Sequence, residues 1–118
     1  MKKNLTVYLG VSADIFHHGH INIIEKSLKY GNLIIGLLTD KAISEKKRVP
    51  MLNWKQRYKI LTNIKGVYKV VKQNEWDYSK NLLKYKPQIF VHGDDWKHKD
   101  SYDYKSRGKV VKILKKIN

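Results

Sequence analysis

Cysteine is absent from the 118 residues, which excludes a disulfide framework, a thiolate metal site and a thiol nucleophile. Long apolar runs are absent as well, because the longest, residues 33–38, is far shorter than the ~20 residues of a membrane span. The apolar stretch at residues 5–11 is short and contains Thr6 and Tyr8, so it predicts a first β-strand rather than a signal peptide. We therefore expect a cytoplasmic protein without a membrane partner.

Acidic residues and arginine are both scarce beside lysine. The chain has 10 acidic and 25 basic residues, a formal net charge of +15, and its only arginines are Arg48, Arg57 and Arg107. A charge of this size attracts polyanions. Because arginine is the usual bidentate reader of base edges, its scarcity argues against a specific nucleic-acid partner. A solvated, lysine-rich surface explains many of these lysines equally well.

Strand and helix patterns alternate along the chain and predict a single α/β domain, residues 1–118. Apolar runs and alternation predict strands at residues 5–10, 33–38, 67–71 and 88–92. Helical spacing predicts helices at residues 19–30, 40–44, 54–63 and 107–117, and another from Asp77 or Ser79 to Tyr85. Strands that alternate with helices are joined by crossovers, so we expect a doubly wound, Rossmann-like parallel sheet.

Capping residues and apolar stripes predict where three of these helices begin and which face they bury. Asp40 is expected to cap the helix at 40–44, and residues 45–50 to form a charged loop. Asn53 is expected to cap the helix at 54–63, whose apolar stripe is Tyr58, Ile60, Leu61 and Ile64. Residues 97–104 are polar and expected to be irregular. The helix that follows is expected to bury Val110, Val111, Ile113, Leu114 and Ile117.

Three polar clusters follow predicted strands, at the edge where open α/β sheets bind ligands: residues 12–20, 39–48 and 93–96. The first is the most informative, since it places His17 and His20 three residues apart on one face of a helix's first turn. Unpaired backbone N–H groups and the positive end of the helix dipole meet there. Gly19 lets a phosphate approach the backbone closely. This cluster predicts an anion site.

A metal site is the competing interpretation of the same cluster, because three histidines with Asp14 nearby supply ligands that zinc accepts. These residues all come from one short turn and no distant carboxylate joins them, so we expect no metal held by protein side chains. The sequence contains neither G-x-x-x-x-G-K-[ST] nor G-x-G-x-x-G, so it offers no P-loop and no dinucleotide fingerprint.

The segment at residues 14–21, D-I-F-H-H-G-H-I, resembles the H-x-G-H signature of the cytidylyltransferase-like nucleotidylyltransferases. W-K-Q-R at residues 54–57 is similar to the family's x-x-x-R helix start, and V-H-G-D-D-W at residues 91–96 is similar to the G-D-D-W of glycerol-3-phosphate cytidylyltransferases. G-L-L-T-D-K-A-I at 36–43 and K-R-V-P at 47–50 resemble the cytidylyltransferase domains that accompany phosphoenolpyruvate mutase in phosphonate biosynthesis. The resemblance covers nearly the whole chain.

This resemblance implies nucleotidyl transfer, in which a phosphate or phosphonate oxygen attacks the α-phosphorus of CTP and pyrophosphate leaves. Such chemistry depends mainly on positioning and on charge stabilisation. By the resemblance, His17 and His20 hold the α- and β-phosphates. Lys46, with Arg48 beside it, closes onto the phosphates and the acceptor, and Arg57 supplies a fixed positive charge. The implied cofactor is Mg²⁺, bound through the CTP phosphates.

The same resemblance implies the remaining binding residues. The implied nucleotide pocket is formed by Ser12, the backbone at Ala13, Asp14, Gly19, Asp95 and Trp96. Trp76 matches a family tryptophan near the acceptor. Plainer roles stay open for several of them: the two tryptophans as packing residues, Lys46 as a solvated lysine, and Arg57 as an ion-pair partner of Asp40.

Departures from the family pattern refine these expectations. V-S-A at residues 11–13 replaces G-T-F, as in the phosphonate branch, and Tyr68 stands where the glycerol-3-phosphate enzymes carry an aspartate. The family continues past its last helix here into a strand and an R-T-x-G-I-S-T-T-like motif that grips the triphosphate. The sequence ends at Asn118, so we expect a domain without that motif.

A phosphonate is therefore the first expectation for the acceptor, and glycerol-3-phosphate is the alternative. An adenylyltransferase of the same superfamily is a nearer alternative, which G-D-D-W disfavours. A non-catalytic basic module that binds nucleotides or nucleic acid is the alternative of another class. The resemblance also implies a homodimer, and a phosphoenolpyruvate mutase domain that is fused to this one or is its partner.

Overall fold

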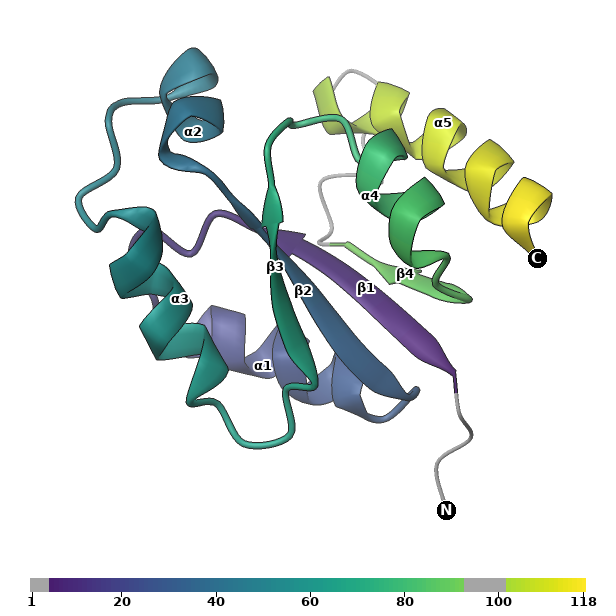
Figure 1. Ribbon diagram of the computed structural model, residues 1–118, viewed down its shortest axis with the longest axis horizontal. Helices are drawn as coiled ribbons and strands as arrows, with labels where there is room; N and C mark the ends of the chain where they lie inside the picture. Colours follow the sequence, from purple (N-terminus) through teal and green to yellow (C-terminus); the bar gives the residue numbers. More distant parts are fainter. Residues whose placement is uncertain (1–4, 93–101) are drawn as a thin grey trace.

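The computed structural model describes residues 5–92 and 102–118, and the side chains of residues 5–92 and 107–118. Strands and helices follow one another in the predicted order along this part of the chain, including the two predicted helices, α2 and α3, that separate β2 from β3 (Figure 1). In order, the elements are β1 (Thr6–Val11), α1 (His18–Leu28), β2 (Asn32–Leu38), α2 (Asp40–Lys46), α3 (Trp54–Thr62), β3 (Lys69–Gln73), α4 (Ser79–Tyr85), β4 (Ile89–Val91) and α5 (Tyr102–Ile117).

The four strands form one sheet in the order β3-β2-β1-β4, and every neighbouring pair is parallel. The chain moves outward from β1 through β2 to β3 and then returns to the other side of β1 for β4. Strand order therefore reverses at β1, and the carboxyl ends of the strands at this switch point are where such sheets bind ligands. The predicted doubly wound parallel sheet is confirmed.

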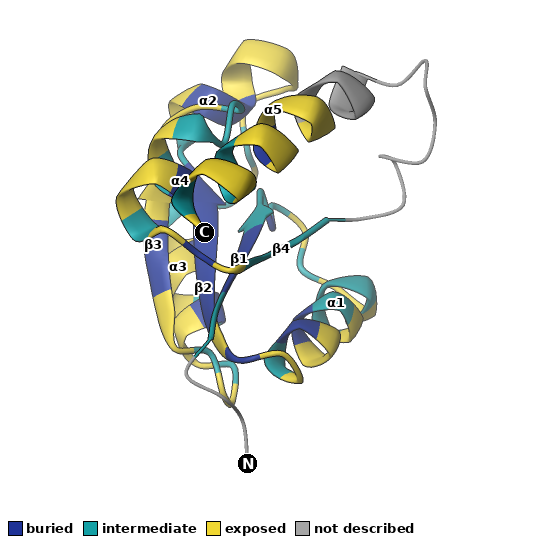
Figure 2. Ribbon diagram, turned by 90° about the vertical axis from the view of Figure 1, so that its right-hand side faces the viewer, coloured by how far each residue is buried: buried dark blue, intermediate teal, exposed yellow. Residues whose placement is uncertain are grey.

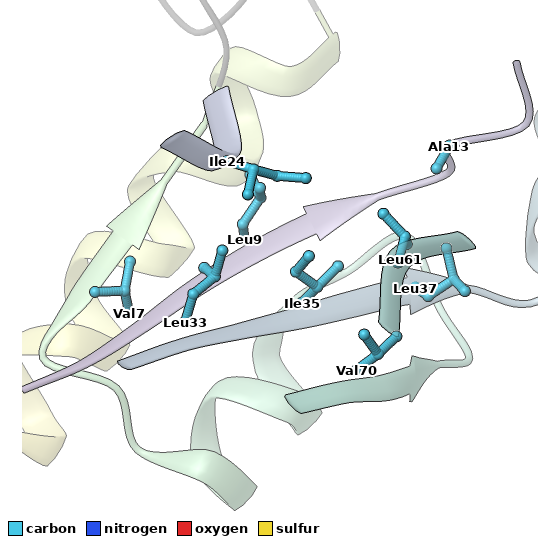
Figure 3. Close-up of a cluster of buried hydrophobic side chains, with 9 residues drawn as sticks. All are labelled: Val7, Leu9, Ala13, Ile24, Leu33, Ile35, Leu37, Leu61 and Val70. Atoms are coloured by element: carbon cyan, nitrogen blue, oxygen red, sulfur yellow. The ribbon is translucent and has the colours of Figure 1, made fainter. Parts of the chain in front are cut away.

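Helices cover both faces of the sheet. On one face, Ile24 of α1 and Leu61 of α3 pack against inward side chains of the three longer strands, and Figure 3 shows Ile24 next to Leu9 of β1. On the other face, Leu82 of α4 and Val110 of α5 pack against a separate cluster. Figure 2 shows β2 as mainly buried, β4 as intermediate and the outer sides of the helices as exposed. Strands buried on both faces explain why β2 reads as one continuous apolar run.

Several predicted helix details need correction. Thr39, not Asp40, is the N-cap of α2, because the Thr39 hydroxyl accepts a hydrogen bond from the Ala42 N–H. Asp40 is the first helical residue, where its charge suits the helix dipole. Asn53 does cap α3, in a reciprocal box with Gln56. In the α3 stripe, however, Tyr58 is exposed.

Two predicted boundaries also shift. Strand β3 covers Lys69–Gln73 rather than residues 67–71, and helix α5 begins at Tyr102 rather than at residue 107. Of the side chains expected to be buried by α5, Val110 is buried, whereas Val111 is 39% exposed. No described helix combines the length and the apolar character that a membrane crossing requires.

Candidate active site

His17 and His20 cap the N-terminus of α1 with their own side chains. His17 Nδ1 accepts from the Gly19 N–H at 3.0 Å, and His20 Nδ1 accepts from the His17 N–H at 3.1 Å. The two ring centroids lie 4.4 Å apart with the ring planes tilted by 53°, and Phe16 stacks on His20 at 5.2 Å. This reciprocal box satisfies two of the orphan N–H groups of the first turn and fixes both imidazoles in place.

The box also determines which ring nitrogen carries the N–H. Because Nδ1 of each ring accepts a backbone N–H, the proton of each neutral imidazole lies on Nε2. Partial burial, and then repulsion from His17, lower the pKa of His20 below its ordinary value, so this ring is neutral at physiological pH. Two Nε2–H donors at a helix N-terminus make an arrangement that binds phosphate oxygens.

Small residues make the turn into α1 sterically feasible. A Cβ atom at Gly19 would lie 2.7 Å from His17 Cε1, so any side chain there would displace the His17 ring. Ala13 has φ of 50°, a left-handed conformation that is costly for a residue with a Cβ, and its methyl group is packed in the core. The sequence predicted the need for Gly19 from phosphate approach, and the structure adds the packing of His17 as a second reason.

Asp14 ties the turn to the loop between α2 and α3. One carboxylate oxygen pairs with Arg48 at 2.7 Å, and the other accepts the N–H groups of Met51 at 2.8 Å and Leu52 at 3.2 Å. Desolvation raises the pKa of Asp14, but the backbone N–H of Leu52, the Arg48 guanidinium and the N–H of Met51 outweigh it and hold that pKa below its ordinary value. Both oxygens are engaged, so Asp14 acts as an anchor.

A cleft of about 240 Å³ opens between this turn, α2 and the loop after it. We call it the histidine cleft; its lining residues are Ser12, Asp14, Ile15, His20, Ile43, Lys47 and Arg48. Of the predicted nucleotide residues, Ser12, Asp14 and His20 line this cleft and His17 does not; Arg48, which the resemblance assigns to the acceptor, also lines it. Lys47 was missed, because nothing in the run of basic residues at 46–48 distinguishes one lysine from its neighbour.

Arg57 does not face the histidine cleft. Its side chain is fully buried, its Nε–H donates to Leu52 O at 3.0 Å, and its Nη1 donates to Ser12 O and Leu38 O at 2.8 and 2.7 Å. Its Nη2 pairs with Asp40 at 2.6 Å. The ion pair with Asp40 that the sequence left open is therefore present. In this structure Arg57 cross-links the ends of β1 and β2 and touches no free surface.

Lys46 and Trp76 meet in a second depression, beside the carboxyl ends of β2 and β3. The Trp76 indole donates to Ala42 O of α2, and Lys46 Nζ lies 5.4 Å from the Trp76 ring centroid. We call this depression, of about 590 Å³, the Trp76 groove; it is lined by Thr39, Lys41, Glu45, Lys46, Asn74, Glu75, Trp76 and Asp77. The structure thus brings the two predicted acceptor residues Lys46 and Trp76 together, whereas Arg48 lies in the histidine cleft.

Two predicted nucleotide contacts, Asp95 and Trp96, lie outside the described residues. Among the residues that are described, no three His, Cys, Asp or Glu side chains are arranged to hold a metal ion. The Asp14 carboxylate is occupied by Arg48 and two N–H groups. Imidazole N–H and lysine donors suit phosphate oxygens rather than a cation, so the described side chains fit no magnesium cage.

Comparisons with known proteins connect this geometry to a family. The family model described as Cytidylyltransferase-like matches residues 8–117. The chain belongs to this family. Glycerol-3-phosphate cytidylyltransferase of Bacillus spizizenii is 34% identical over 88 residues, which cover 73% of this chain and 68% of that protein. FAD synthase of Methanosphaera stadtmanae is 32% identical over 109 residues, which cover 86% of this chain and 74% of that protein. Ethanolamine-phosphate cytidylyltransferase of Dictyostelium discoideum is 29% identical over 96 residues, which cover 80% of this chain and 27% of that protein.

A solved structure agrees with this assignment at the level of fold. The lipopolysaccharide core biosynthesis protein from Thermoplasma volcanium GSS1 superimposes with a TM-score of 0.78 over 92% of this chain and 88% of that one, at 24% sequence identity. The predicted family, the Rossmann-like fold and the nucleotidyltransferase class of enzyme are confirmed. The roles of individual site residues and the association with phosphoenolpyruvate mutase stay predictions.

Proposed function

We propose that this cytidylyltransferase-family enzyme transfers CMP from CTP to a small acceptor that carries a phosphonate or a phosphate. An acceptor oxygen attacks the α-phosphorus, a new P–O bond forms, and the bond from the α-phosphorus to pyrophosphate breaks. The observation that supports this best is the pair of Nε2–H donors that His17 and His20 present at the N-terminus of α1. Donors fixed before the reaction stabilise the charge that develops between the α- and β-phosphates.

Other described groups add positive charge around these donors. Lys47 and Arg48 line the histidine cleft and so lie where the triphosphate would enter. Lys46 and Trp76 line the adjoining groove, which is our candidate for the acceptor. Magnesium would arrive with the triphosphate and be held by its oxygens, and the described side chains would orient the phosphates through hydrogen bonds and charge.

The acceptor has two candidates, one that rests on the sequence resemblance and one for which relatives are named. A phosphonate acceptor follows from the resemblance to the domains that accompany phosphoenolpyruvate mutase. The same resemblance leads us to propose a cytoplasmic homodimer with such a mutase as its partner. Glycerol-3-phosphate fits at least as well, because curated relatives are named for it. Adenylyl transfer stays an alternative, since FAD, the product for which other relatives are named, contains an adenylate.

Calorimetric titration with CTP and with ATP, in magnesium and at physiological salt, tests the nucleotide. Saturable binding of CTP that far exceeds binding of ATP supports the proposal. Equal weak binding of both that fades as salt rises would indicate only the net charge of +15 and favour a basic binding module. Pyrophosphate release with a phosphonate, glycerol-3-phosphate or ethanolamine phosphate then identifies the acceptor.

His17→Ala tests the chemistry, with His18→Ala as the matched control. His17 supplies a Nε2–H donor, whereas no hydrogen bond of the described helix cap uses the exposed His18 side chain. We expect His17→Ala to lower the rate of pyrophosphate release by about 100- to 1000-fold, the scale for losing one charge-stabilising donor. His18→Ala should stay within a few-fold of wild type. Equal rates in both variants would refute the catalytic role of His17.

A further inference from the structure

Three polar side chains form a hydrogen-bonded chain beneath the Trp76 groove, inside an otherwise apolar cluster. The hydroxyl of Tyr8, a fully buried residue of β1, donates to Gln73 Oε1 at 2.5 Å. Asn81 of α4 donates to the same hydroxyl at 2.9 Å. Burial raises the pKa of Tyr8 above its ordinary value, so the hydroxyl keeps its proton and remains a donor. Nothing in the proposed chemistry uses these groups.

Space for this network is created by two glycines that face each other across neighbouring strands. Gly10 of β1 is paired with Gly36 of β2 in the sheet register. A Cβ atom at Gly36 would lie 1.8 Å from the Tyr8 oxygen and 2.7 Å from Gln73 Oε1, and one at Gly10 would lie 2.5 Å from the Tyr78 ring and 3.1 Å from Gln73 Oε1. The strands thus leave a gap in which the tyrosine hydroxyl and the glutamine amide meet. A buried polar pair costs free energy unless it is hydrogen-bonded, and here the Tyr8 hydroxyl both donates and accepts while the Gln73 side chain accepts through Oε1 and donates through Nε2.

Gln73 connects the network to both walls of the Trp76 groove. Its side-chain amide donates to Glu75 O at 2.9 Å, which fixes the loop that carries Trp76. Its backbone carbonyl accepts from the Thr39 N–H at 3.0 Å, which fixes the N-cap of α2. The Trp76 indole also donates to Ala42 O, which connects loop 74–77 directly to α2. Gln73 therefore holds loop 74–77 through its side chain and the start of α2 through its backbone carbonyl.

We propose that Tyr8 and Gln73 are positioning residues for the acceptor, because together they hold the Trp76 loop at the distance from α2 that an acceptor phosphate or phosphonate requires. Tyr8 locks the rotamer of Gln73, and Gln73 holds the loop. The assignment of the groove to the acceptor rests on the proposed function, whereas the positioning of Trp76 by Tyr8 does not.

The first test is independent of catalysis and follows the indole N–H resonances of ¹⁵N-labelled protein. Tyr8→Phe keeps the ring and removes only the hydroxyl. We expect hydrogen exchange of the Trp76 indole to accelerate about tenfold, the scale for losing one buried hydrogen bond. The Trp54 indole donates to Leu37 O and serves as the internal control. Unchanged Trp76 exchange, or equal acceleration of both indoles, would overturn the positioning role.

The second test separates acceptor from nucleotide. We expect Tyr8→Phe to raise KM for the acceptor about tenfold while KM for CTP changes less than twofold, because the histidine cleft has no contact with the network. Val110→Ala removes volume from the same apolar cluster without touching the hydrogen bonds, and it should leave both KM values near wild type. A rise in both KM values for Tyr8→Phe would mean general loosening and overturn the proposal.

A double variant tests whether Tyr8 acts through Gln73. Gln73→Met keeps the volume and removes both side-chain hydrogen bonds. If the tyrosine acts through the glutamine, adding Tyr8→Phe to Gln73→Met has no further effect on Trp76 exchange or on the acceptor KM. Additive effects would contradict the mechanism. If exchange behaves as expected while no acceptor is turned over, the positioning role survives and the proposed function fails.

Discussion

Replacing Arg57 by leucine is the sharpest test of how the active-site edge is held together. The resemblance to known enzymes favours a catalytic charge at this position. In the structure, however, the whole Arg57 side chain is buried and three of its hydrogen bonds go to backbone carbonyls. Leucine preserves much of the volume and none of the hydrogen bonds. The variant therefore isolates the bonds that join β1, β2 and the loop before α3.

The expected loss can be worked out from the groups that leucine leaves behind. Three carbonyl oxygens lose their donor, the buried one of Leu38 and the part-buried ones of Ser12 and Leu52, and each unsatisfied acceptor costs about 1 kcal/mol, the low end of the range for buried groups. The pair with Asp40 adds little, because that carboxylate is 47% exposed and screened by water. We expect Arg57→Leu to lower the free energy of unfolding by about 3 kcal/mol.

Urea unfolding followed by circular dichroism measures this loss, provided that the slope with urea stays unchanged. Arg48→Leu is the matched control, because Arg48 also pairs with an aspartate but is 55% exposed. It should shift the midpoint far less than Arg57→Leu. A loss below 1 kcal/mol for Arg57→Leu would show that the buried contacts contribute little to the free energy of unfolding. That result would favour a catalytic role for Arg57 over a structural one.

Two further predictions follow from local packing and charge. Gly36→Ala places a Cβ 1.8 Å from the Tyr8 oxygen, so it should lower the free energy of unfolding by more than about 2 kcal/mol. Gly108→Ala, in α5, meets no atom within 4 Å and should raise the free energy of unfolding by roughly 0.5–1 kcal/mol. A urea midpoint that falls for Gly108→Ala would contradict this second expectation. The Lys109 ammonium, with hydrogen bonds from Ser79, lowers the pKa of Asp77 to about 2. The stability that Asp77 contributes is therefore present above its usual pKa, near 4, and is lost as pH falls through about 2, so the deficit of Asp77→Asn against wild type should vanish across that window. A deficit that stays constant from pH 5 to pH 2 would refute the assignment.

Local sequence patterns were enough to predict the order of elements and the histidine turn. A continuous apolar run identifies β2 because both faces of that strand are buried. Asn53 followed by Gln56 is a capping box that needs no tertiary information. His17 and His20 flank Gly19 on one helical turn, so their proximity follows from helix geometry alone.

The remaining errors arise where distant residues decide the structure. Thr39 outcompetes Asp40 as the cap of α2 because the Thr39 N–H is already held by Gln73 O, 34 residues further along the chain. Tyr8 reads as an ordinary strand residue, since its partners are 65 and 73 residues away. The three carbonyls that bind Arg57 carry no sequence signature, because any residue provides a backbone oxygen.

Two sets of contacts of different strength hold the candidate active site together, a buried set at the strand ends and an exposed set in the loop after α2. Arg57 and Gln73 are both buried, reach the carboxyl ends of β1, β2 and β3, and bind mainly backbone groups, so they form a floor that is costly to deform. The loop above the histidine cleft is held by Asp14, through an exposed ion pair with Arg48 and two N–H groups. An exposed ion pair contributes little and weakens with salt. If the cleft binds a triphosphate as proposed, the triphosphate competes with Asp14 for the Arg48 guanidinium, so we expect nucleotide binding to weaken the Arg48–Asp14 pair while the contacts of Arg57 and Gln73 stay unchanged.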